Sequence, residues 1–122
     1  MSKKILLVED EKILVEMYKS KLEQAGFEVF LAPDAEEGFV AAKKEKPDLV
    51  MLDILLPKGN GLSFLEKLRE DPEIKNTIVV AFSNYDGVET KKKAFELGVE
   101  DYLIKTNYTP QELIEKIKEY LK

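Results

Sequence analysis

Apolar residues form short continuous runs along the chain, and these runs alternate with longer segments in which apolar positions recur every three or four residues. A short apolar run is typical of a strand buried on both faces, whereas a period of 3.6 residues predicts an amphipathic helix. The runs predict five strands, at residues 5–8, 28–32, 49–52, 78–82 and 102–104.

Helix boundary signals lie between these runs. Gly26 follows the first periodic segment, Asp34 with Glu37 begins the second, and Thr109 precedes a proline in the last. Short polar residues favour helix starts, and glycine favours helix ends. The pattern predicts five helices, at residues 12–25, 34–46, 62–69, 86–97 and 109–121.

Strict alternation of strand and helix predicts an α/β fold in which a doubly wound parallel sheet carries helices on both faces. The 122 residues show no linker, no internal repeat and no shift in composition. We therefore expect a single domain over residues 1–122.

Composition excludes several kinds of chemistry. The chain has no Cys and no His, so a thiolate nucleophile, an imidazole base and the usual zinc sites are excluded. The net charge of −5 argues against a nucleic-acid partner. No apolar run approaches the roughly 18 residues of a membrane span, so we expect no membrane partner and a cytoplasmic location.

The predicted strands end in polar residues that belong together chemically. The first strand is followed by Glu9 and Asp10, the third by Asp53, the fourth by Ser83 and the fifth by Lys105. Ligands of an open parallel sheet bind beyond the carboxyl ends of its strands. The glycine-rich loops of dinucleotide and nucleotide-phosphate sites are absent after the first strand.

This combination favours a metal-dependent phosphoryl site. Carboxylates held close together need a counter-charge, which Lys105 and a hard divalent cation, Mg²⁺ or Mn²⁺, would supply. Phosphoryl transfer mainly requires positioning and charge neutralisation. Asp53 would be the nucleophile, and Ser83 a hydrogen-bond donor.

With these residues in place, the whole chain resembles the receiver domain of two-component response regulators, chemotaxis receivers included. The resemblance implies a flavodoxin-like (βα)5 three-layer sandwich with strand order 2-1-3-4-5. It implies that Asp53 is the phosphoacceptor, that Asp10 ligates the metal directly, and that Glu9 does so mainly through water. The backbone carbonyl of Leu55 would be a further metal ligand.

The remaining matches to the receiver-domain family concern the contacts to the phosphoryl group and the conformational switch that transmits the signal. The resemblance implies that Ser83 and Lys105 contact the phosphoryl group and that Ser83 and Tyr102 form the conformational switch. The segment Pro57-Lys58-Gly59-Asn60-Gly61 matches a turn of the family.

Two departures from the family pattern stand out. Thr106 replaces the proline that usually follows the lysine in a cis peptide, which leaves both a cis and a trans Lys105–Thr106 bond open. Leu55, Asn84 and Tyr85 occupy positions that in the family tune hydrolysis of the acyl phosphate. Because Leu55 has no polar side chain to guide a water, we predict slow hydrolysis.

The resulting function is a stand-alone phosphoacceptor switch rather than an enzyme. The donor would be a histidine kinase or histidine phosphotransfer protein, necessarily another chain, and the downstream protein target is not identified by the sequence. The main alternative is a phosphorylation-independent interaction module. A phosphatase with a carboxylate nucleophile is a third, although Leu55 stands where such enzymes usually carry a second acid.

Overall fold

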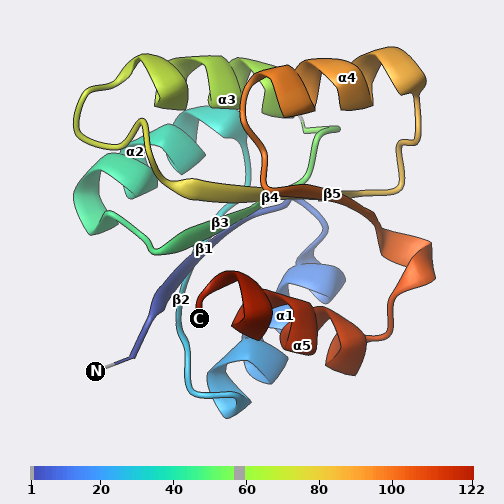
Figure 1. The fold of residues 1–122 in the computed structure, drawn as a ribbon. Coiled ribbons are helices and arrows are strands. Elements are labelled where there is room, and N and C mark those ends of the chain that lie inside the picture. Colours follow the sequence, from blue (N-terminus) through green and yellow to red (C-terminus); the bar gives the residue numbers. More distant parts are fainter. Residues whose placement is uncertain (1, 57–59) are drawn as a thin grey trace.

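The computed structural model describes residues 2–56 and 60–122, in which five strands alternate with five α-helices (Figure 1). The strands are β1 (Lys4–Val8), β2 (Glu28–Ala32), β3 (Leu49–Leu52), β4 (Ile78–Ser83) and β5 (Asp101–Ile104). The helices are α1 (Lys12–Gln24), α2 (Ala35–Glu45), α3 (Gly61–Glu70), α4 (Val88–Glu96) and α5 (Pro110–Tyr120). A short 3-10 turn, η1 (Lys105–Asn107), follows β5.

All neighbouring strands are parallel, and their order across the sheet is β2-β1-β3-β4-β5. Helices α2, α3 and α4 cover one face, and α1 and α5 cover the other (Figure 1). The predicted doubly wound three-layer architecture and its strand order are therefore confirmed. Strand order reverses between β1 and β3, the place where such sheets bind their ligands.

Each face of the sheet has its own hydrophobic core. In β1, Leu6 and Val8 face the helices α2 to α4, while Ile5 and Leu7 face α1 and α5. Successive side chains of a strand point to opposite faces, so both sets must be apolar when both faces are covered. The continuous apolar runs arise from this double burial.

Helix ends agree with the boundary signals in most places. Asp34 caps α2 by accepting a hydrogen bond from the Glu37 amide, and Thr109 and Glu112 form a capping box at α5. Asp86 does not open α4 as predicted. The helix begins at Val88, and the Asp86 carboxylate pairs with Lys91 at 3.1 Å instead of capping a backbone amide.

A search of residues 2–56 and 60–122 finds no helix that is both long and apolar enough to cross a membrane.

The packing beneath α3 gives a test of the fold. Phe64 is completely buried between α3 and the sheet, so Phe64→Ala should lower the free energy of unfolding by about 3–5 kcal/mol. The matched control is Phe95→Ala, because that ring is 49% exposed on α4 and its loss should change stability by about 1 kcal/mol or less. Urea unfolding measures both, and equal losses would contradict the assignment of the core.

Candidate functional site

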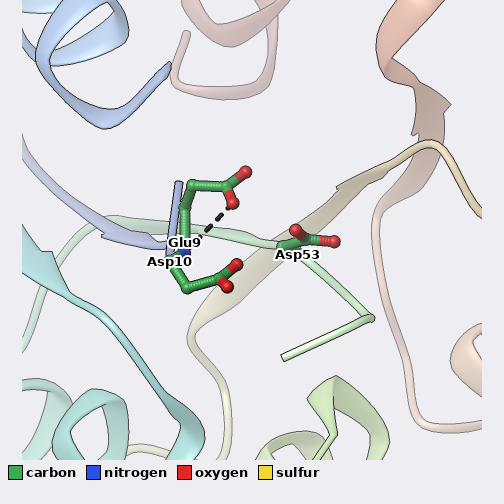
Figure 2. Close-up of side chains that lie close together, drawn as sticks. All are labelled: Glu9, Asp10 and Asp53. Carbon is green, nitrogen blue, oxygen red and sulfur yellow. Dashed lines mark hydrogen bonds between the residues drawn. The ribbon is translucent and has the colours of Figure 1, made fainter. Parts of the chain in front are cut away.

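The carboxyl edge of the sheet brings three acidic side chains together. Val8 pairs with Leu52 in the β1–β3 register, so the residues that follow these strands emerge side by side. Glu9 and Asp10 follow β1, and Asp53 follows β3 (Figure 2). One carboxylate oxygen from each of the three lies within 4.8 Å of the others.

Backbone amides hold two of these carboxylates in place. Glu9 Oε2 accepts hydrogen bonds from the amides of Asp10 at 3.0 Å and Glu11 at 3.2 Å. Asp53 Oδ1 accepts one from the amide of Leu55 at 3.2 Å. The Asp10 carboxylate is exposed, and among the described residues no hydrogen bond to it is found. Asp10 is thus the acid most open to a solvent-borne cation.

Lys105 crosses from the end of β5 to the same pocket. Its ammonium donates a buried hydrogen bond to Glu9 Oε1 and a second, at 3.2 Å, to Asp53 Oδ2. All three side chains are inaccessible, with exposed fractions of 3% for Glu9, 7% for Asp53 and 8% for Lys105. A buried ammonium between two buried carboxylates is a charge cluster that needs mutual compensation.

One ammonium does not neutralise the pocket. Burial raises the pKa of Glu9 to about 6, and the Asp53 charge adds to this, although the hydrogen bond from Lys105 acts in the opposite direction. Burial alone would lower the pKa of Lys105, but the hydrogen bond to Glu9 and the two carboxylate charges outweigh it and raise that pKa. The pocket therefore keeps excess negative charge and favours a further cation.

The donor set fits a hard divalent ion. Carboxylate oxygens are the ligands that Mg²⁺ and Mn²⁺ prefer, and the exposure of Asp10 would leave room for water in the coordination sphere. Glu9, Asp10 and Asp53 provide these oxygens. Thiolate and imidazole ligands cannot contribute, since the chain has no Cys and no His.

Ser83 and Tyr102 are linked through a third residue, Tyr85. The buried Ser83 hydroxyl accepts a hydrogen bond from the Tyr85 amide at 3.1 Å. The Tyr102 hydroxyl donates to the Tyr85 carbonyl at 2.6 Å, with its ring turned inward and 7% exposed. Burial raises the pKa of Tyr102, so its hydroxyl keeps the proton that it donates.

Tyr85 was not assigned a switch role from the sequence. Both of its hydrogen bonds, to Ser83 and to Tyr102, use the backbone amide and carbonyl of Tyr85. Every residue has these backbone groups, so the residue type at position 85 does not reveal the contacts. Only its position two residues after Ser83 marked it, and that position pointed to hydrolysis rather than to coupling.

The structure decides the peptide bond after Lys105, which the sequence leaves open. No peptide bond is cis in the part of the chain that the structure describes, so the Lys105–Thr106 bond is trans. The backbone instead makes the 3-10 turn η1, which closes with a hydrogen bond from the Tyr108 amide to the Lys105 carbonyl at 3.4 Å.

The segment after Asp53 is held by close backbone contact. The Gly61 amide donates to the Ile54 carbonyl at 2.8 Å. A Cβ on Gly61 would lie 2.8 Å from both the Asp53 carbonyl oxygen and Ile54 Cα, so only glycine fits beside the end of β3. Residues 57–59 of the turn predicted from the sequence lie outside the described residues.

Leu55 has a 56% exposed side chain at the rim of the pocket. Its amide contacts Asp53, and the role of its carbonyl as a metal ligand stays a prediction. The geometry as a whole defines a doubly wound α/β domain whose carboxyl edge is an acidic pocket suited to a cation and closed by a buried lysine.

Comparisons with known proteins agree with this class. A family model of the response regulator receiver domain matches residues 5–118. The alkaline phosphatase synthesis transcriptional regulatory protein PhoP of Bacillus subtilis is 35% identical over 122 residues, which are 100% of this chain and 50% of PhoP. The chain thus spans about half the length of this curated relative.

Two solved structures are similar over nearly the whole chain. A CheY-like response regulator receiver domain protein from Methanospirillum hungatei has a TM-score of 0.92 and 31% identity, covering 99% of this chain and 94% of its own. The phosphorylated cyanobacterial phytochrome response regulator RcpA has a TM-score of 0.82 and 28% identity, covering 98% and 91%. This chain belongs to the response regulator receiver domain family.

The shared ammonium leads to a test of the pocket's electrostatics. Because both the hydrogen bond and the charge of Lys105 lower the pKa of Glu9, the substitution Lys105→Met should raise that pKa above about 6. Carboxyl carbon NMR titration in the absence of divalent cations measures it. Lys118→Met, on the exposed end of α5, is the matched control and should leave the Glu9 titration unchanged.

The sign of the pH effect on stability follows from the same shift. Glu9 has a higher pKa in the folded chain than its ordinary 4.5, so its contribution to stability is fully present below pH 4.5 and is lost as the pH rises through about 6.

A Glu9 pKa in Lys105→Met at or below the wild-type value would show that the ion pair between Lys105 and Glu9 is not formed in solution.

Proposed function

We propose that residues 1–122 form a single receiver domain in which Asp53 accepts a phosphoryl group from a phosphohistidine on another chain. Receiver domains are the signalling phosphoacceptors of two-component systems, and they receive their phosphoryl groups from histidine kinases. The observation that carries the proposal is the position of Asp53, which directly follows the central strand β3, contacts Lys105 and belongs to the acid cluster with Glu9 and Asp10.

In the proposed transfer, a carboxylate oxygen of Asp53 forms a bond to phosphorus while the bond from phosphorus to the donor imidazole nitrogen breaks. The electron pair of that bond stays on the nitrogen. Lys105 is placed to bind a phosphoryl oxygen that carries negative charge, since its ammonium already lies 3.2 Å from Asp53 Oδ2. The Ser83 hydroxyl accepts from Tyr85 and keeps its own proton to donate.

Receiver domains bind Mg²⁺ in an acidic pocket. We assign that role to Glu9, Asp10, Asp53 and the Leu55 carbonyl, with Mn²⁺ as an alternative ion. When bound, the ion neutralises the charge of the phosphoryl oxygens. The chain's own residues orient the oxygen ligands through the amide hydrogen bonds on Glu9 and Asp53.

The signal would leave the pocket through Ser83. If its hydroxyl moves toward the phosphoryl group, the hydrogen bond from the Tyr85 amide changes, and so does the carbonyl that Tyr102 binds. The surface formed by α4, β5 and α5 would then change its affinity for a protein partner. The chain would act as a switch rather than as an enzyme with a diffusible substrate, in the cytoplasm.

Direct binding of nucleic acid by these residues is disfavoured by their net charge of −5. The relative PhoP is named a transcriptional regulatory protein, and that activity belongs to a chain about twice as long. A phosphorylation-independent interaction module is not favoured, because the acid pair, Asp53 and Lys105 form one connected pocket.

Incubation with acetyl phosphate and Mg²⁺ tests the proposal. The intact protein should gain the mass of one phosphoryl group, and Asp53→Asn should gain none. Asp86→Asn is the matched control, because that carboxylate is exposed and pairs with Lys91 outside the pocket. Removal of divalent cations with a chelator should abolish the gain. A wild-type protein that stays unmodified would overturn the proposal, and a gain that persists in Asp53→Asn would move the acceptor elsewhere.

The exposed Leu55 side chain leads to a prediction about lifetime. It places an apolar group at the rim of the pocket, where a polar side chain would hold an attacking water. Leu55→Asn should therefore shorten the lifetime of phosphorylated Asp53 severalfold, as followed by the decay of the phosphorylated mass after the donor is removed. Leu55→Met keeps an apolar side chain of similar volume and should keep the wild-type lifetime. Equal decay in Leu55→Asn and the wild type would contradict the role of Leu55.

A further inference from the structure

Helix α4 is attached to the rest of the molecule mainly by its two ends. Among its residues only Ala94 is buried, while Val88 is 78% exposed and Phe95 is 49% exposed. The apolar contact that fixes an ordinary amphipathic helix is therefore small here. The polar contacts at the ends decide how the helix is held.

The C-terminal end of α4 is held by the guanidinium of Arg69, in the last turn of α3. Arg69 Nε donates to the Leu97 carbonyl at 2.7 Å, and Nη2 donates to the Gly98 carbonyl at 2.9 Å. Nη1 donates to the carbonyls of Lys75 at 2.8 Å and Thr77 at 2.7 Å, just before β4. One side chain thus ties together the ends of α3 and α4 and the start of β4.

Only arginine can make this set of contacts. Its guanidinium carries five N–H donors in a rigid planar fork, and four carbonyl acceptors use them here. Gly98, at φ +81°, brings the backbone close, since a Cβ there would lie 3.4 Å from Arg69 Nε. The guanidinium is half-buried, and burial lowers its pKa from the ordinary value, yet all four of its partners are neutral carbonyls. Arg69 therefore acts through hydrogen-bond geometry rather than through an ion pair.

The N-terminal end of α4 is held differently. Gly87 is its N-cap and makes no side-chain cap hydrogen bond. The preceding segment is attached through Tyr85, whose amide bonds Ser83 and whose carbonyl bonds Tyr102. This end therefore depends on the two residues that the proposed function makes the switch, and the C-terminal end does not.

We propose that Arg69 is a positioning residue that clamps the C-terminal end of α4, so that the helix pivots there and only its N-terminal end responds to Asp53. The inference rests on the proposed function for the event that moves the N-terminal end. It adds which end is fixed and which residue fixes it. Motion of α4 then becomes a rotation about the clamp rather than a release of the whole helix.

Residue-resolved amide hydrogen exchange by NMR tests the clamp first in the unphosphorylated protein. The amides of Leu97, Gly98 and Val99 bond to carbonyls of α4 at 3.0–3.2 Å and report on its C-terminal end. In Arg69→Met these amides should exchange about tenfold faster than in the wild type. The reason is that local opening of this end of the helix no longer has to break the four hydrogen bonds of Arg69. Arg69→Lys keeps the charge without the fork and should be intermediate. Lys67→Met, two residues earlier on α3 and exposed, is the matched control and should leave the exchange of these amides unchanged.

The second measurement repeats the exchange with acetyl phosphate and Mg²⁺. In the wild type, phosphorylation should change the exchange of the Tyr85 and Lys91 amides and leave Leu97 to Val99 unchanged. In Arg69→Met the phosphorylation-dependent change should extend to Leu97 to Val99, while the gain of one phosphoryl group stays complete. A variant with a merely weakened fold would show faster exchange at both ends without a new dependence on phosphorylation.

The outcomes separate the two proposals. No gain of a phosphoryl group by the wild type would overturn the proposed function and the pivot with it, while the exchange of unphosphorylated Arg69→Met would still decide whether the clamp exists. Full phosphorylation combined with equal responses at Tyr85 and Leu97 in the wild type would overturn the pivot alone. Wild-type protection of Leu97 to Val99 in Arg69→Met would overturn the clamp.

Discussion

Lys105 places one ammonium between two carboxylates, those of Glu9 and Asp53, at a depth where all three side chains are almost fully buried. A charge at such a depth persists only if it is paired, so each of the three depends on the others. The net charge of the cluster remains negative, because two carboxylates share one ammonium. Burial keeps the pKa of Glu9 raised to about 6 despite the hydrogen bond from Lys105. In the proposed function, this excess of negative charge attracts a divalent cation. In the proposed metal site, stability and chemistry would make opposite demands on Glu9, because its carboxylate would serve as a cation ligand while its charge is buried.

The sheet makes this cluster possible because its strands end together. β1, β3 and β5 all end at the same edge of the sheet. There, backbone amides orient Glu9 and Asp53, while the Lys105 side chain extends toward them from the end of β5. The strands themselves are apolar on both faces and have no freedom to slide, since a slip by one residue would exchange the two cores. The sheet is therefore a rigid support that keeps the carboxylates of Glu9 and Asp53 within hydrogen-bond distance of the Lys105 ammonium.

The proposed signalling needs some part of this rigid structure to be weakly held, and of the five helices α4 has the fewest buried residues. Its buried surface is small, its N-terminal end is attached through Tyr85 to Ser83 and Tyr102, and its C-terminal end is attached through Arg69. The hydrogen bonds at the C-terminal end involve no residue of the acidic pocket, whereas those at the other end involve Ser83, at the same carboxyl edge of the sheet. A change of charge at Asp53 would therefore reach the helix asymmetrically.

The sequence alone determined the parallel α/β fold, because doubly buried strands must be continuously apolar and the helices between them must be amphipathic. It also placed Glu9, Asp10, Asp53 and Lys105 at one edge, since the ends of parallel strands meet there. It missed the start of α4, where Asp86 pairs with Lys91 rather than with the backbone, and it left the Lys105–Thr106 bond open, which the fold makes trans. Only the tertiary structure decided which carboxylates share the ammonium, that Tyr85 joins Ser83 to Tyr102, and that Arg69 binds four carbonyls. Most of these contacts join residues far apart in the chain, and most use backbone groups, which every residue carries and no sequence pattern distinguishes.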